Sequence, residues 1–355
     1  MSNRRMLMLW LVTLAIACGA ALGMVSRDED PAPARLSFGP IRGMTVSCHG
    51  IGQSWGSDAM VETMRELRDL GVTWIAIHPY ARIGGDGSVG SSGGRGRSFD
   101  PSWVRRPIEA AKDLGLRVMI KPHLAYWGSP FSWRGVIRFE DEETWARFFR
   151  EYTAWIQEMA SLSEGADAFV VGTELDQTIQ HEAAWRSIIT TIRAELPETP
   201  LTYAANWDQY QRVPFWDALD AIGVQGYFPL VAHAEAPEAA ELAAGWAARV
   251  AELDRFRATW NRPVVLTELG YDDGNAAART PWASRSRGSE RNPELQQQCL
   301  TAALAAVDAA PGIEGAFLWK WFPGSSQRGD FLKSTPAMRA VLAAQWGPPP
   351  APAED

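Results

Sequence analysis

Two segments of this sequence each carry a glutamate at the end of an apolar run. Val170–Leu175 reads VVGTEL, and Val264–Tyr271 reads VVLTELGY. Runs rich in β-branched residues are typical of strands buried on both faces. An unpaired carboxylate inside such a strand would be very costly to bury, whereas the C-terminal tips of parallel barrel strands are where active sites lie. We therefore expect Glu174 and Glu268 to face one pocket, an arrangement typical of glycoside hydrolysis.

Strand-like and helix-like patterns alternate along the chain and predict the elements that position these glutamates. Eight of each in alternation favours a single α/β domain, a closed (β/α)8 TIM barrel, over a doubly wound sheet. The predicted strands are 44–48, 73–77, 117–121, 168–172, 201–205, 221–225, 263–267 and 315–319, and the predicted helices are 58–70, 107–114, 142–162, 182–196, a short one near Trp216, 236–259, 293–310 and 336–345.

The glycine-containing segments do not match nucleotide-binding loops. The first strand ends in His49–Gly52, which is a poor dinucleotide fingerprint, and the Gly/Ser-rich stretch 84–96 lacks the Lys-Ser/Thr pair of a phosphate loop. We expect the stretch 84–96 to be a loop at the barrel rim. The formal net charge of −8 and the lack of a basic stripe argue against a nucleic-acid partner.

Polar and aromatic residues gather at the predicted strand tips, while the strand bodies are aliphatic. Aromatic platforms with a few fixed hydrogen-bonding partners are what a sugar-binding cleft needs, and the 17 Trp of the chain exceed ordinary usage. The candidate substrate-binding residues are His78, Arg82, His123, Trp127, Asn206, Trp207, Gln225, Tyr271, Trp319 and Trp321.

Metal chemistry is the rival explanation for histidines at strand tips. The chain has five His in total, without the His-x-His pair that metal-dependent barrel hydrolases use, and without a Cys/His cluster of zinc spacing. We therefore expect neither a metal nor another cofactor. Cys48 and Cys299 are expected to be buried free thiols, although a disulfide between them stays open.

Several motifs together resemble the clan A glycoside hydrolases, and most closely glycoside hydrolase family 113. They are Gly172–Leu175 (GTEL), Leu266–Tyr271 (LTELGY) and Trp319–Pro323 (WKWFP), with a tyrosine, Tyr227, after the sixth strand. The likeness covers about 43–345. It implies a (β/α)8 barrel, a retaining double displacement without metal, and action on β-1,4-mannan or its oligosaccharides.

The resemblance also implies roles for individual residues. Glu174 would be the general acid/base and Glu268 the nucleophile, Tyr227 would hydrogen-bond the nucleophile, and Trp319 would floor the subsite of the sugar that is cleaved. The chain departs from the clan at Thr173, where most members have an asparagine that touches the sugar 2-hydroxyl. Asn206 is a candidate substitute for that contact.

Two other functions stay open at this point. One is a non-catalytic carbohydrate-binding barrel at the cell surface, which the presence of both glutamates disfavours. The other is a transglycosylase that uses the same residues and differs in how water is excluded. The choice among mannan, glucan and galactan also stays open.

The termini predict export. Arg4 and Arg5 precede an apolar stretch, Met6–Val25, which favours a signal peptide at 1–25; an uncleaved membrane anchor, or lipid attachment at Cys18, is the competing interpretation. We expect a linker at 26–42, the catalytic domain at 43–346 and a disordered Pro/Ala-rich tail at 347–355. The protein is expected to be a monomer that is secreted, periplasmic or anchored at the cell envelope.

Overall fold

The computed structural model describes residues 36–91, 99–232, 237–325 and 327–347. The export segment 1–25, most of the expected linker and all but the first residue of the expected tail lie outside the described residues. Phe38 is already buried, and its carbonyl accepts a hydrogen bond from Arg117 Nη1 at 2.8 Å. The folded domain therefore begins earlier than residue 43. Within the described ranges, no helix is long and apolar enough to cross a membrane.

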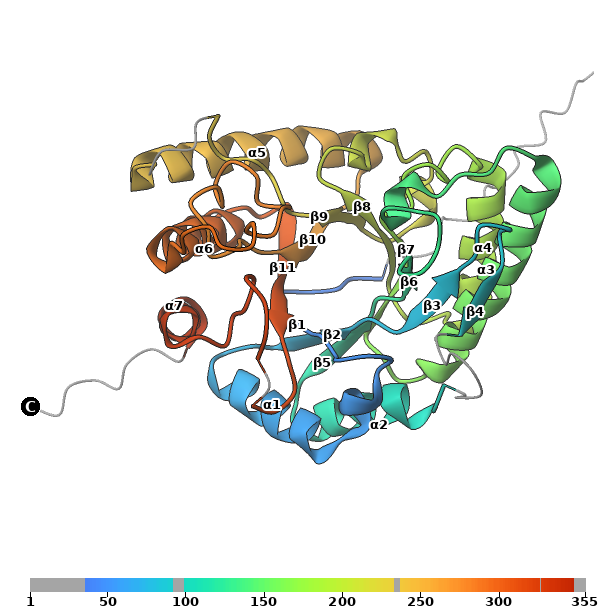
Figure 1. Ribbon diagram of the computed structural model, residues 1–355, viewed down its shortest axis with the longest axis horizontal. Coiled ribbons are helices and arrows are strands. Elements are labelled where there is room, and N and C mark those ends of the chain that lie inside the picture. Colours follow the sequence, from blue (N-terminus) through green and yellow to red (C-terminus); the bar gives the residue numbers. More distant parts are fainter. Residues whose placement is uncertain (1–35, 92–98, 233–236, 326, 348–355) are drawn as a thin grey trace, which may run out of the picture. The chain divides into compact units, whose positions relative to one another are not determined.

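Eight parallel strands close into one barrel, which confirms the predicted (β/α)8 fold (Figure 1). Around the barrel the order is β1-β11-β10-β9-β8-β7-β5-β2, so consecutive barrel strands are neighbours throughout. The strands are β1 (Ile41–Val46), β2 (Trp74–Ile77), β5 (Arg117–Ile120), β7 (Ala168–Thr173), β8 (Leu201–Asn206), β9 (Ile222–Gln225), β10 (Val264–Leu269) and β11 (Ile313–Trp321).

The described residues form seven α-helices rather than the predicted eight. Between β8 and β9 the structure has only 3-10 turns, Tyr210–Arg212 and Trp216–Ala218, because the connection is short and contains Pro214, which has no N–H to donate. The helices are α1 (Asp58–Asp69), α2 (Ser102–Asp113), α3 (Glu142–Leu162), α4 (Glu182–Glu195), α5 (Ala239–Trp260), α6 (Pro293–Asp308) and α7 (Pro336–Trp346).

Helix α2 begins five residues earlier than the sequence predicts. Pro107 was expected to open the helix, but it lies inside it. The side chain of Asp100 accepts the N–H of Ser102 at 2.9 Å and so satisfies a free donor of the first turn. The proline leaves one helical carbonyl without its usual donor and does not end the helix.

A small second sheet rises beside the barrel mouth, and the sequence did not predict it. It consists of β3 (Tyr80–Ile83), β4 (Val89–Ser91) and β6 (His123–Ala125), with β3 antiparallel to β4 and parallel to β6. The expectation that 84–96 is entirely loop is therefore wrong for β4. Strands β3 and β6 directly follow β2 and β5, so this sheet carries Tyr80, His123 and the loop after β6 to the mouth (Figure 1).

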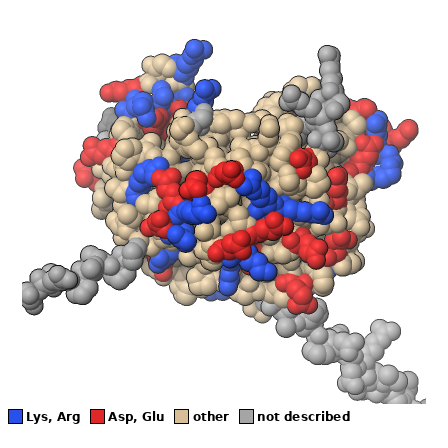
Figure 2. Space-filling model, turned by 90° about the horizontal axis from the view of Figure 1, so that it is seen from below, with Lys and Arg blue, Asp and Glu red and all other residues tan. Residues whose placement is uncertain are grey.

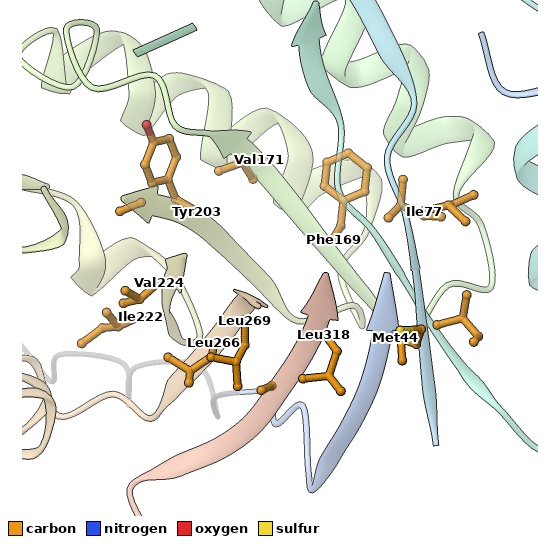
Figure 3. Packing of buried hydrophobic residues seen from close by; sticks show 14 of the residues in the cluster. Met44, Ile77, Phe169, Val171, Tyr203, Ile222, Val224, Leu266, Leu269 and Leu318 are labelled. Carbon is orange, nitrogen blue, oxygen red and sulfur yellow. The ribbon is translucent and has the colours of Figure 1, made fainter. Parts of the chain in front are cut away.

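Side chains alternate between two apolar layers along the barrel strands, as the period of two requires. The larger layer joins the outward-facing strand residues to the helices; Figure 3 shows part of it, including Phe169, Val171 and Leu266. The smaller layer fills the barrel interior and includes Trp74, Met119, Val170, Val265 and Phe317. The next inward-facing positions towards the strand C-termini are polar: His78, Lys121, Gln225 and Thr267, all buried.

Charged side chains on the outer surface are mixed in sign. On the face in Figure 2, acidic and basic side chains lie next to one another, without a continuous patch of either sign. Ion pairs join Arg65 to Glu62 within α1 and Arg106 of α2 to Asp58 of α1. This face therefore lacks the single-signed field that an electrostatic polymer-binding surface has.

The close contact between β1 and β11 predicts a strict requirement for glycine at position 43. A Cβ there would lie 2.5 Å from Phe317 Cδ1 in the barrel interior. We expect Gly43→Ala to lower the free energy of unfolding by about 1–3 kcal/mol, because overpacking displaces neighbouring side chains. Urea unfolding measures this. Gly90→Ala in β4, where a Cβ meets no atom within 4 Å, is the matched control, and equal effects of the two substitutions would contradict the account.

Candidate active site

A cavity of about 760 Å³ opens at the C-terminal ends of the barrel strands, and both predicted glutamates line it. Its wall combines carboxylates, cations and many aromatic rings. The lining residues are Ser47, Tyr80, His123, Tyr126, Trp127, Trp133, Arg134, Glu174, Asn206, Trp207, Asp208, Tyr227, Glu268, Trp282, Ser284, Trp319, Lys320 and Phe331.

Glu268 is the second-last residue of β10, and its carboxylate contacts a lysine cation and a tyrosine hydroxyl. Lys121 forms an ion pair with Glu268 Oε1, and its Nζ also donates to the carbonyl of Thr267 at 3.1 Å. Tyr227 Oη donates to Glu268 Oε2 at 2.6 Å. Burial alone would raise the pKa of Glu268, but the Lys121 charge and the hydrogen bonds from Lys121, Tyr227 and Gln225 outweigh it, and the pKa is lowered.

Glu174 follows β7 in a different environment. Its φ of +53° lies in the left-handed region, which is uncommon outside glycine and marks the point where the strand ends. Arg134 Nη1 lies 2.9 Å from Oε2, and Gln225 Nε2 donates to Oε1 at 3.3 Å. Burial, reinforced by the negative charge of Glu268, raises the pKa of Glu174 even though Arg134 opposes the shift.

The two carboxyl groups therefore differ in acid strength although they share one cavity. Glu268 is the stronger acid and stays ionised to lower pH, while Glu174 keeps its proton to higher pH. A pair of titratable groups whose environments push their pKa values apart is suited to separate nucleophile and proton-donor roles. Lys121 lowers the pKa of Glu268, and Arg134 limits the rise at Glu174.

Five of the ten predicted substrate-binding residues line the cavity. They are His123, Trp127, Asn206, Trp207 and Trp319, alongside Tyr227 and the two glutamates. His123 is almost completely buried, and its Nε2 lies 3.9 Å from Glu268 Oε1. Trp127 is half exposed at the mouth, with 50% of its surface accessible.

Tyr271 and Trp321 were expected to touch substrate, and the structure places both outside the cavity lining. Tyr271 is completely buried, and its hydroxyl accepts a hydrogen bond from Trp246 Nε1 at 2.8 Å. Trp321 is buried with the Arg339 guanidinium 4.6 Å from its ring centroid. Register shifts near the strand tips interrupt the alternation of side chains. Tyr271 and Trp321, which regular alternation would turn towards the cavity, therefore face the helices instead.

His78, Arg82 and Gln225 also lie outside the cavity lining. His78 is completely buried and stacks on His123, with ring centroids 5.0 Å apart, so it supports a lining residue. Arg82 is exposed and donates to the carbonyl of Trp127 at 2.9 Å. Gln225 is completely buried and contacts Glu174. The direct sugar contacts expected of these three residues do not fit their positions.

Lys121 and Arg134 are site residues that the sequence reasoning missed. Lys121 had a usable signal, because it ends an apolar strand in the same way as the two glutamates. Arg134 had none, since it lies in a 3-10 turn, Arg134–Val136, within an irregular segment. A hydrogen bond from its Nε to the carbonyl of Leu124 at 3.1 Å holds it over the cavity.

The residue before Glu174 is not among those that line the cavity. Thr173 is buried and donates to the carbonyl of Pro122 at 3.1 Å. Asn206 does line the cavity, and its amide donates to both oxygens of Asp176 at 3.1 and 2.9 Å. Burial raises the pKa of Asp176 to about 7.

Among the described residues, no group of three or more His, Cys, Asp or Glu could hold a metal ion.

Comparison with known protein families decides the class of this barrel. The model of glycoside hydrolase family 113 matches residues 44–330. The chain belongs to glycoside hydrolase family 113. It is therefore a glycoside hydrolase with a carbohydrate substrate, as the sequence motifs indicated.

Solved structures of family 113 members are similar to this chain. The chain is similar to the family 113 β-mannanase AaManA from Alicyclobacillus acidocaldarius, solved in complex with ManMIm, at 27% identity and a TM-score of 0.74, over 86% of this chain and 97% of that one. It is also similar to a family 113 β-1,4-mannanase at 21% identity and a TM-score of 0.75, over 87% and 99% of the two chains. No curated protein matches the chain.

More distant barrels share the fold alone. A β-glucuronidase from Ruminococcus gnavus has 14% identity and a TM-score of 0.56, over 88% of this chain and 50% of that one.

The Lys121–Glu268 ion pair predicts that removing the lysine changes both the pKa of Glu268 and the free energy of unfolding. In Lys121→Met the buried carboxylate loses its cation, so we expect the pKa of Glu268 to rise and the free energy of unfolding at neutral pH to fall by about 3–5 kcal/mol. Carbon-13 NMR of labelled glutamate carboxyls and urea unfolding measure the two effects. Lys320→Met is the control, because Lys320 lines the same cavity and its charge acts on Glu268, but it has no direct ion pair with Glu268 among those of the described residues. The pKa of Glu268 should therefore rise less in Lys320→Met. Equal shifts in both variants would argue against the ion pair.

Proposed function

We propose that this protein is a retaining β-mannanase that cleaves β-1,4-mannan or its oligosaccharides by double displacement. The observation that carries the proposal is that two glutamates share one cavity of a family 113 barrel, with Lys121 and Tyr227 bonded to Glu268. Glu268 is the nucleophile, and Glu174 is the general acid/base. The choice of mannan rests on the likeness to the β-mannanases named above.

In the first step the ionised Glu268 attacks the anomeric carbon of the sugar. The bond from that carbon to the glycosidic oxygen breaks, and Glu174 gives its proton to the departing oxygen. Lys121 and Tyr227 keep Glu268 ionised before the attack. The product of this step is a glycosyl ester on Glu268 and an ionised Glu174.

In the second step a water molecule replaces the enzyme oxygen. Glu174 now acts as a base and takes a proton from the water, whose oxygen attacks the anomeric carbon while the bond to Glu268 breaks. Esterification removes the negative charge of Glu268, and with it one of the causes that raise the pKa of Glu174. Glu174 is therefore a stronger acid, and holds its charge more readily, in the intermediate than in the free enzyme. Arg134 stabilises the charged form.

Aromatic surfaces on different sides of the mouth suit a polymer rather than a single sugar. Trp127 follows β6 next to Tyr80, with ring centroids 5.1 Å apart. Trp207 follows β8 and stacks on Trp282 with centroids 5.1 Å apart and planes at 23°. Apolar sugar faces stack on such rings. Trp319, which also lines the cavity, would floor the subsite of the sugar that is cleaved.

Two further features belong to the same proposal. Asn206, at the cavity wall, supplies the sugar 2-hydroxyl contact that Thr173 cannot make from its buried position. The basic and apolar N-terminal segment directs the protein out of the cytoplasm, so that it meets its polysaccharide in the periplasm, at the cell envelope or outside the cell.

Activity of single variants tests the division of roles. Glu268→Ala should lose mannan hydrolysis by on the order of 10³-fold or more, and added azide should restore turnover with an inverted product, because a small anion can occupy the place of the missing carboxylate. Glu174→Ala should lose much less kcat/KM on substrates with good leaving groups than on mannan, because a good leaving group departs without a proton. Its kcat should fall on both kinds of substrate, because the second step lacks its base. Reducing-end release and NMR of the anomeric proton measure the outcome.

Two results would contradict this assignment. Full mannan activity in Glu268→Ala would exclude it as the nucleophile. An equal loss of kcat/KM on activated and unactivated substrates in Glu174→Ala would exclude it as the acid. Sugar binding without hydrolysis of any β-glycan by the wild-type protein would favour the carbohydrate-binding alternative.

The exposed tryptophans predict a difference between long and short substrates. Trp282 is 49% exposed at the cavity edge. We expect Trp282→Ala to raise KM for mannan by roughly 2- to 10-fold, which corresponds to about 0.5–1.5 kcal/mol for an aromatic contact. Activity on a short aryl glycoside serves as the internal control and should stay unchanged. Equal losses on both substrates would mean that Trp282 supports the fold of the site and not polymer binding.

A further inference from the structure

The amide of Gln225 lies between the two catalytic carboxyl groups. Gln225 ends β9 and is completely buried, and its backbone pairs with Glu268 in the β9–β10 ladder. Its Nε2 donates to Glu174 Oε1 at 3.3 Å. Hydrogen bonding from Gln225 lowers the pKa of both glutamates. The pKa values of both glutamates therefore depend on which end of the amide, NH2 or carbonyl, faces them.

A threonine hydroxyl bonds the opposite end of the amide. Thr267 is completely buried next to Glu268, and its Oγ1 donates to Gln225 Oε1 at 3.0 Å. An amide has a donor end and an acceptor end of nearly the same shape, so its orientation is fixed only by its partners. The ionised Glu268 can only accept and so selects the NH2 end, and Thr267, which donates to Oε1, holds the amide in that orientation.

We propose that Thr267 is a positioning residue that acts through Gln225, holding the amide so that its NH2 group, and not its carbonyl, faces Glu174. An NH2 donor stabilises an ionised carboxylate, whereas a carbonyl oxygen accepts from a protonated carboxyl and repels an ionised one. Thr267 thereby favours the ionised form of Glu174, which is the base of the second step. This inference rests on the proposed function for that role.

The same residue also reaches the nucleophile, through a different atom. The backbone carbonyl of Thr267 accepts the hydrogen bond from Lys121 Nζ, and Lys121 pairs with Glu268. Side-chain substitution at 267 leaves this carbonyl in place. Variants that differ only at the hydroxyl therefore separate the contact with Gln225 from the contact with Lys121.

Several charged and titratable groups act on Glu174 besides Gln225. None of them contacts the Thr267 hydroxyl among the hydrogen bonds of the described residues, so a change at that hydroxyl reaches Glu174 through Gln225. These groups are Arg134 from the loop after β6, Lys121 after β5, Glu268 of β10, Asp176 after β7, Tyr227 after β9 and Tyr203 of β8.

The test compares Thr267→Val with Thr267→Ser by carbon-13 NMR titration of the full chain with labelled glutamate carboxyls. The Glu174 signal is assigned by its loss in Glu174→Gln. We expect the pKa of Glu174 to rise by roughly one unit in Thr267→Val, the scale of one charge-assisted hydrogen bond, and to stay at the wild-type value in Thr267→Ser, which keeps the hydroxyl. If Thr267→Val does not fold, Thr267→Cys, whose thiol is a weaker donor, should show a smaller rise.

A double-mutant cycle with Gln225→Met shows whether the amide carries the effect. The rise caused by Thr267→Val should disappear when Gln225 is already Met, because the residue through which Thr267 acts is gone. A rise that persists in the Gln225→Met background would overturn the proposal. Equal pKa values of Glu174 in the wild type, Thr267→Val and Thr267→Ser would also overturn it.

This readout does not depend on the substrate. If the wild-type protein leaves mannan intact and the Glu174 pKa still rises in Thr267→Val alone, the positioning role stands and the proposed substrate is wrong. If mannan is cleaved and the pKa does not respond, the substrate stands and the positioning role is wrong. In an active enzyme, the alkaline limb of the pH profile of kcat/KM should move up with the Glu174 pKa, since the first step needs Glu174 protonated.

Discussion

The ion pair between Lys121 and Glu268 is the interaction on which the rest of the site depends. Both side chains are almost fully removed from water at the top of the barrel interior, where an unpaired charge would be very costly. The pair has two consequences. It keeps Glu268 ionised despite burial, and the negative charge that persists there helps to keep the proton on Glu174. Lys121 thus fixes the charge of Glu268, and burial together with that charge keeps Glu174 protonated to higher pH.

The barrel interior has two layers, and the upper, polar layer gives this buried ion pair its hydrogen-bonding partners. The lower part is filled with apolar side chains such as Met119, Val265 and Phe317. The next inward positions along the same strands are Lys121, Thr267 and Trp319, because inward-facing residues recur every second position. The polar groups therefore satisfy one another across strand tips. Tyr227 and Gln225 supply further donors from the neighbouring strand end.

Much of this arrangement is predictable from the sequence, and the failures have physical causes. The barrel and the positions of Glu174 and Glu268 follow from apolar runs that end in a charged residue. The same rule applies to Lys121, where it was overlooked. Tyr271 and Trp321 were misplaced because register shifts near the strand tips change which way a side chain faces. Arg134 lies in an irregular segment, whose course depends on tertiary contacts that no periodic pattern encodes.

The central claim is that Glu268 is the ionised nucleophile of this glycoside hydrolase. The most direct measurement is to trap the covalent intermediate with a 2-deoxy-2-fluoro-β-mannosyl fluoride, in which the fluorine slows the second step, and to locate the sugar by mass spectrometry of proteolytic peptides. The account predicts a single fluoromannosyl group on the peptide that contains Glu268. A label on Glu174 or on another carboxylate, or hydrolysis of mannan with inversion at the anomeric carbon, would contradict it.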